Sequence, residues 1–184
     1  MKKLILLFLV FLTLGVGCID NSSQGNIQQE TSKESIQKTI PSWFNYELKD
    51  VSSGEKFTIN DYKGKIILLE SFAVWCPVCT LQERETKILH EELGDSFISI
   101  SLDTDPNEPE SKILEHIKRN EFNWIFSQSP VELTRIFIKE FNVGIVNAPA
   151  SPMILICPDQ SYRMLEEKGV KSSETLKKEI NTCN

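Results

Sequence analysis

Trp75-Cys76-Pro77-Val78-Cys79 is the stretch that decides the fold of this 184-residue chain. The apolar run at residues 66–69 precedes it, and a segment with the pattern of an amphipathic helix follows it. Pro77 suits the first turn of a helix, where its missing N–H is not needed. We therefore predict that the two cysteines lie at a strand-to-helix junction, where they can close into a small disulfide ring and open again.

Short apolar runs alternate with segments of helical periodicity on both sides of this junction. The predicted strands cover residues 43–48, 56–59, 66–72, 97–102, 153–157 and 162–166. The predicted helices cover residues 76–93, 107–120, 129–141 and 172–180. The first helix is expected to bury an apolar face made of Val78, Leu81, Ile88 and Leu89. This order predicts a layered α/β domain over residues 41–184.

The N-terminal residues have the pattern of an export signal, predicted over residues 1–18. Lys2 and Lys3 precede an apolar stretch, and Cys18 follows it. The stretch is shorter than the roughly 20 residues that a membrane span needs. Val16-Gly17-Cys18 resembles the cleavage site of prokaryotic lipoproteins, which implies a lipid on Cys18 and attachment to the outer face of the cytoplasmic membrane. An uncleaved anchor and plain cleavage nearby are the alternatives.

Residues 19–40 are rich in Ser, Gln, Asn, Thr and Glu and contain few large apolar side chains. Such a stretch cannot bury enough surface to fold, so we predict a flexible polar linker. The whole chain has a net charge of −6, and nucleic acid is therefore not expected as a partner. Export would place the cysteines in a compartment where disulfides persist.

A Cys-x-x-Cys pair serves either metal binding or redox chemistry. A structural zinc site needs four ligands, and the sequence has no second pair of this kind. Its only histidines, His90 and His116, fall on predicted helices without ligand spacing, and each is expected to be a surface or partly packed residue. We therefore expect no metal and no cofactor.

Redox chemistry is favoured by the predicted position of Cys76 at a helix N-terminus, which stabilises a thiolate. In such a pair, the first cysteine attacks the disulfide of a partner and the second resolves the mixed disulfide. We assign attack to Cys76 and resolution to Cys79. The start of the helix is expected to leave Cys76 the more exposed of the two.

Several stretches resemble the extracytoplasmic thioredoxin-fold proteins of the TlpA/ResA type. They are residues 68–79, the turn Lys63-Gly64-Lys65 and residues 151–156, and the resemblance extends over the whole predicted domain. It implies thiol-disulfide oxidoreductase activity. It also implies a thioredoxin-like α/β fold, in which helices flank a central mixed β-sheet, with an N-terminal β-hairpin and an inserted helix.

The resemblance assigns roles near the cysteines. Trp75 matches a tryptophan that shields the disulfide. Glu70 matches a buried acid beneath the second cysteine, which implies that it takes the proton of Cys79 during resolution. An ordinary carboxylate at the end of a strand is the alternative for Glu70. The family often has a glutamate three residues after the second cysteine, where this chain has Gln82.

The resemblance also implies a substrate-binding set. Pro152, in preference to Pro149, matches a cis-proline that faces the cysteines. Ser151, which precedes it, matches the position whose backbone pairs with substrate. Trp75 and Pro77 complete the set.

The dipeptide Pro77-Val78 matches neither the common thioredoxin pair nor the histidine-containing pair of strong oxidants. The resemblance favours a monomeric reductase that acts on cysteine-containing exported proteins and receives electrons from an upstream membrane donor. A disulfide-inserting oxidase of the same fold is the alternative. The scarcity of histidine argues against a copper-handling protein. A non-catalytic lipoprotein would not need Trp75, Glu70 and Pro152 around the cysteines.

Cys157 and Cys183 are the remaining cysteines. In the implied fold the last helix runs back toward the end of the strand that carries Cys157. We therefore hypothesise a structural disulfide between the two, which would stabilise the domain by about 2–4 kcal/mol. Two unpaired thiols are the alternative, with Cys157 as a small buried apolar residue.

Overall fold

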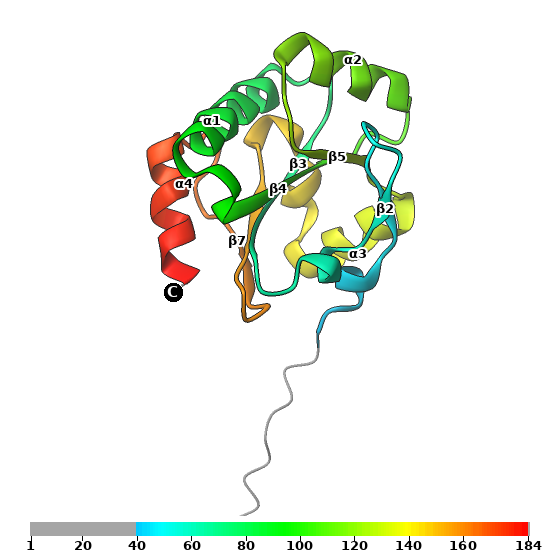
Figure 1. Cartoon of the computed structure of the whole chain (residues 1–184). Helices are drawn as coiled ribbons and strands as arrows, with labels where there is room; N and C mark the ends of the chain where they lie inside the picture. The colour runs from blue at the N-terminus through cyan, green and yellow to red at the C-terminus, as the bar shows by residue number, and fades with distance from the viewer. Residues whose placement is uncertain (1–39, 184) are drawn as a thin grey trace, which may run out of the picture. The chain divides into compact units, whose positions relative to one another are not determined.

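A computed structural model of the chain describes residues 40–183 (Figure 1). The predicted signal peptide, its Cys18 and residues 19–39 of the predicted linker lie outside the described residues. Among the described residues, no helix combines the length and the apolar character that a membrane crossing requires.

The central sheet has five strands in the order β5-β4-β3-β6-β7. Their bounds are β3 (Ile66–Phe72), β4 (Phe97–Asp103), β5 (Ile125–Gln128), β6 (Met153–Ile156) and β7 (Tyr162–Met164). Strand β4 runs parallel to β3 and β5, whereas β6 runs antiparallel to β3 and β7. The sheet is therefore mixed, as the resemblance implied. Two further strands, β1 (Leu48–Lys49) and β2 (Lys56–Phe57), pair antiparallel in a small sheet of their own.

Four α-helices cover the sheet: α1 (Pro77–Leu93), α2 (Glu110–Asn120), α3 (Val131–Phe141) and α4 (Ser173–Ile180). Helices α1 and α4 lie side by side (Figure 1) and share an apolar cluster with one face of the sheet. Helix α3 and the β1-β2 pair pack against the other face. The inserted helix, α2, joins the cluster that surrounds the two cysteines of the Cys-x-x-Cys pair.

The side chains of β3 alternate between the two faces of the sheet, because successive side chains of a strand point to opposite faces. Ile67 and Leu69 pack in the cluster on the α3 face, whereas Leu68 packs in the cluster with α1 and α4. Glu70 shares the face of Leu68 by this alternation and is 2% exposed. A carboxyl group is therefore buried between the central strand and α1.

The structure differs from the predicted strands in two places. The segment predicted as a strand over residues 43–48 begins as a 3-10 turn, Ser42–Asn45, and of its residues only Leu48 belongs to a paired strand, β1. Trp43 and Phe44 are both buried, and the tight turn allows these neighbours to enter one core where an alternating strand would separate them. Strand β5 was not predicted, because four residues are too few to show a periodicity.

The predicted apolar face of α1 is also wrong. Leu81 and Ile88 are 48% and 41% exposed, and of the four expected residues only Leu89 is fully buried. The rest of the buried face consists of Cys79, Gln82, Glu83 and Thr86. This face can be polar because Gln82 and Glu83 find hydrogen-bond partners in the neighbouring loop and in α2.

Candidate active site

Cys76 and Cys79 lie where β3 gives way to α1, as the sequence predicted. Cys76 is the N-cap of α1, and the backbone N–H of Cys79 donates a hydrogen bond to Cys76 Sγ at 3.2 Å. The thiol of Cys79 donates to the carbonyl oxygen of Ala148 at 3.1 Å. Both cysteines are free thiols. Cys76 was expected to be the more exposed of the two, but both are buried, at 1% and 0% exposed, within an apolar cluster that includes Phe72.

Glu70 is buried on the face that α1 covers. Among the described residues, neither of its carboxylate oxygens has a hydrogen-bond partner. Burial raises the pKa of Glu70 well above its usual value, the charge of Glu83 raises it further, and the charge of Lys171 opposes both. Burial also raises the pKa of the Cys79 thiol, and the charge of Glu70 raises it further. The Glu70 charge therefore disfavours ionisation of the Cys79 thiol.

Lys171 is a site residue that sequence reasoning missed. It is 0% exposed, and its ammonium group donates to the carbonyl oxygens of Ser151 and Gly169, each at 2.7 Å. Its backbone N–H and C=O both bond to the side-chain amide of Gln82. Burial lowers the pKa of Lys171, and the charges of Glu70 and Cys79 act in the opposite direction. A buried cation therefore lies within electrostatic reach of the reacting groups.

The segment that leads into β6 faces Cys79 through Ala148, but not as the resemblance implied. Residues 40–183 contain no cis peptide bond, so the Ser151–Pro152 bond is trans. The chain turns instead at Ser151, which adopts the left-handed conformation with φ 43° and ψ 58°. The Ser151 N–H donates to Ala148 O at 2.8 Å, and its C=O accepts from Lys171. Both groups are occupied and Pro152 is buried, so in this conformation neither residue is open to substrate.

Trp75 and Pro77, in contrast, are on the surface. Trp75 is 59% exposed, and its indole N–H donates to the carboxylate of Asp105 at 2.9 Å. The neighbouring Val74 N–H donates to the carboxylate of Glu108 at 2.7 Å. These two acids hold an exposed apolar ring directly beside Cys76.

His116 is not the surface or partly packed residue that we expected. It is 1% exposed and lies 2.6 Å from the fully buried carboxyl of Glu83, measured between Nε2 and Oε2. Burial raises the pKa of Glu83 and lowers that of His116 to about 4. Burial therefore disfavours the charged form of both groups. His90 is partly packed, with Nε2 2.9 Å from Ser99 Oγ.

Cys157 and Cys183 are brought together in the structure. Their sulfur atoms are bonded, at 1.96 Å, and their Cα atoms are 5.1 Å apart. The bond joins the residue after β6 to the last turn beyond α4. It therefore fastens the C-terminal helix to the sheet.

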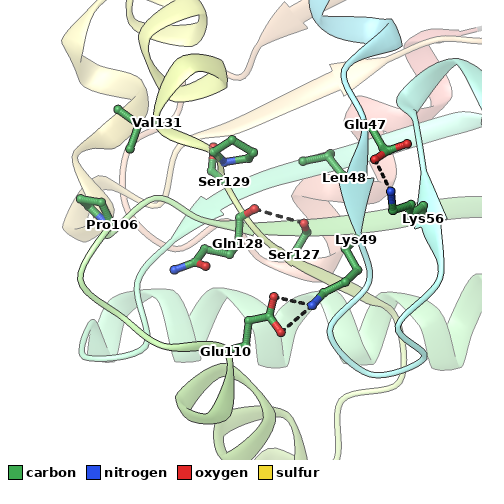
Figure 2. A pocket seen from close by; sticks show the side chains of 11 residues that line it. Glu47, Leu48, Lys49, Lys56, Pro106, Glu110, Ser127, Gln128, Ser129 and Val131 are labelled. Carbon is green, nitrogen blue, oxygen red and sulfur yellow. Dashed lines mark hydrogen bonds and ion pairs between the residues drawn. The ribbon is translucent and has the colours of Figure 1, made fainter.

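A separate hollow lies between the β1-β2 pair and the start of α2 (Figure 2). No cysteine lines it, and its charged groups pair with one another. Lys49 Nζ lies 2.7 and 2.6 Å from the two carboxylate oxygens of Glu110, and Lys56 Nζ lies 2.7 Å from Glu47. The reactive groups are therefore gathered at the N-terminus of α1 and not in this hollow.

Comparison with known proteins agrees with this geometry. A family model described as Redoxin matches residues 34–170. No curated protein matches the chain.

Solved structures match the chain over most of its length. DsbF of Mycobacterium tuberculosis is 15% identical with a TM-score of 0.62, over 79% of this chain and 100% of that one. A putative electron transfer protein of Aquifex aeolicus is 18% identical with a TM-score of 0.63, over 79% and 96%. An exposed lipoprotein thioredoxin of Streptococcus pneumoniae is 17% identical with a TM-score of 0.57, over 74% and 98%. At these identities the likeness shows the fold, which is thioredoxin-like.

Proposed function

The chain belongs to the redoxin family and is a thioredoxin-like thiol-disulfide oxidoreductase, and we propose that it reduces disulfides in exported proteins from the outer face of the cytoplasmic membrane. The observation that carries the proposal is the arrangement of Cys76 as N-cap of α1, with the Cys79 thiol buried behind it and Glu70 within electrostatic reach.

The first step is attack on the substrate. The Cys76 thiolate attacks one sulfur of a substrate disulfide, forms a mixed disulfide and releases the other substrate sulfur as a thiolate. The N-terminus of α1 and the Cys79 N–H, 3.2 Å from Cys76 Sγ, stabilise negative charge on the attacking sulfur.

The second step is resolution. Cys79 loses its proton to the Glu70 carboxylate and attacks Cys76 Sγ, so that the substrate leaves with its second thiol. The substrate gains two electrons and two protons, and Cys76 and Cys79 become a disulfide. The buried charge of Lys171 favours the carboxylate form of Glu70, which is the form that can accept the proton, and it also favours the Cys79 thiolate that forms.

The reducing direction is supported by what lies between the cysteines. Strong oxidants of this class owe their potential to stabilisation of the reduced form. Pro77 and Val78 supply no cation that would hold the Cys76 thiolate in that state. A pair without this stabilisation gives its electrons to substrates more readily, and a membrane donor would restore them.

The proposed location rests on the N-terminal pattern that ends at Cys18, where we place the lipid. One of the similar structures is described as an exposed lipoprotein thioredoxin, which agrees with that placement.

A trapping experiment tests the proposal. Replacing Cys79→Ser removes the resolving thiol, so exported proteins should accumulate in disulfide linkage to Cys76. The matched control is Cys76→Ser, which retains Cys79 but should trap nothing. Equal recovery of disulfide-linked proteins from both variants, or from neither, would contradict the assignment of attack and resolution.

A further inference from the structure

A groove opens directly beside the reactive cysteines, between the first half of α1 and the C-terminal end of α2. Its volume is about 540 Å³. The residues that line it are Val74, Trp75, Pro77, Thr80, Leu81, Arg84, Arg119 and Asn120. None of them takes part in the proton transfer described above, and Ser151 is not among them.

The floor and rim near the cysteines are apolar and exposed. Trp75 is 59% exposed and Leu81 is 48% exposed. Pro77, Leu81 and Arg84 follow the spacing of one helical face, so α1 presents them together. Asp105 holds the Trp75 ring in place by the 2.9 Å hydrogen bond to its N–H. Large apolar side chains exposed side by side indicate a surface that another molecule covers.

The charge of the groove is opposite to that of the chain. Arg84 and Arg119 are its only charged lining residues, in a chain whose net charge is −6. Both side chains are exposed, and within residues 40–183 neither forms an ion pair, although lysines nearby do. Two unpaired guanidinium groups beside an apolar surface are complementary to an acidic, partly apolar polypeptide.

The distance between Cys76 and Arg84 determines where the bound polypeptide should carry its acidic residue. Arg84 follows Cys76 by eight residues along the helix, a rise of roughly 12 Å. An extended polypeptide covers about 3.3 Å per residue, so its acidic side chain would reach Arg84 about three or four positions from the cysteine that Cys76 attacks.

We propose that this groove binds the extended segment of a substrate protein that flanks its reactive disulfide, and that Arg84 and Arg119 select substrates with an acidic residue three or four positions from the attacked cysteine. The inference rests on the proposed function, because it assigns the substrate of the same cysteines. Exposed ion pairs are weak, so two of them should give about a fivefold to tenfold preference.

The test uses short peptides whose single cysteine carries a thiopyridyl group. Attack of Cys76 on the peptide sulfur forms the mixed disulfide and releases pyridine-2-thione, and Cys79 then displaces the peptide thiol. Two electrons and two protons pass from the cysteine pair to the peptide disulfide. The peptides differ only in the residues three and four positions from the cysteine, which are Glu, Gln or Lys. The full chain carries Cys18→Ser, so that this thiol does not contribute to the release.

Two controls separate the groove from the chemistry. The rate with each peptide is divided by its rate with 2-mercaptoethanol, which removes differences in intrinsic reactivity. The thiopyridyl derivative of 2-mercaptoethanol, which is too small to fill the groove, reports on the cysteine pair alone. The matched variants are Arg84→Gln/Arg119→Gln and, on α3, Arg135→Gln/Lys139→Gln, which remove the same charge.

The expected result is that the Glu peptide reacts about fivefold to tenfold faster than the Lys peptide at low salt. This ratio should approach one in Arg84→Gln/Arg119→Gln and at high salt, but persist in Arg135→Gln/Lys139→Gln. If the small disulfide reacts but the peptides do not differ, the groove inference is overturned and the proposed function stands. If neither the small disulfide nor any peptide reacts, both are overturned.

Discussion

Replacing both Cys157 and Cys183 with serine removes the bond that fastens the chain beyond α4 to the end of β6. The two cysteines are 26 residues apart in sequence. For a loop of this length, cross-linking removes about 12 cal/mol/K of entropy from the unfolded chain, which is about 3.5 kcal/mol at room temperature. We therefore expect Cys157→Ser/Cys183→Ser to lower the free energy of unfolding by about 3.5 kcal/mol.

Urea unfolding, followed by tryptophan fluorescence and circular dichroism, measures the difference. Parent and variant both carry Cys76→Ser/Cys79→Ser, so that no other pair can exchange with the bond. A slope of about 1–3 kcal/mol/M implies that the midpoint falls by about 1.2–3.5 M urea. The parent with its disulfide chemically reduced should unfold at the same urea concentration as the variant. This control separates the loss of the bond from the introduction of serine. A loss below about 1 kcal/mol at unchanged slope would refute the chain-entropy reasoning.

The buried ionisable groups lead to three further predictions. Folding raises the pKa of Glu70 above its ordinary 4.5, so the stability of the native chain falls as pH rises from that value. Urea unfolding at several pH values should show a smaller fall in stability for Glu70→Gln than for the native chain. Parallel curves of stability against pH for the two proteins would count against a buried acid at this position. Lys171→Met removes the charge that lowers the pKa of Glu70, so the rate of resolution by Cys79 should reach half its maximum at higher pH; an unmoved profile would exclude this role. Glu83→Ala leaves Nε2 of buried His116 without the partner it has in the structure, and thermal and urea unfolding should show a loss of about 1–3 kcal/mol, which a neutral effect would contradict.

The junction of β3 and α1 could be predicted from sequence because several local preferences agree there. An apolar run, a first-turn proline and a following segment of helical periodicity all indicate a strand followed by a helix. The burial of Glu70 was implied by the resemblance, which matches this residue to a buried acid, and Glu70 is buried in the structure.

The polar interior of α1 could not be predicted in this way. Periodicity assigned Leu81 and Ile88 to the core, but tertiary contacts with the loop before α4 and with α2 place Gln82 and Glu83 there. Lys171 gave no local sign of burial, because a lysine in a charged loop ordinarily faces water. Its partners are carbonyl groups of Ser151 and Gly169, which only the folded chain brings to it.

The equilibrium of the purified full chain with glutathione buffers tests the central claim most directly. Peptide mapping of each state reports which cysteines are joined. We predict a reversible disulfide between Cys76 and Cys79, an unchanged Cys157–Cys183 bond, and a potential nearer to the about −270 mV of thioredoxin than to the about −120 mV of strong oxidants. Failure of Cys76 and Cys79 to form a disulfide in any buffer would contradict the redox assignment. A potential near the about −120 mV of strong oxidants would contradict the reducing direction.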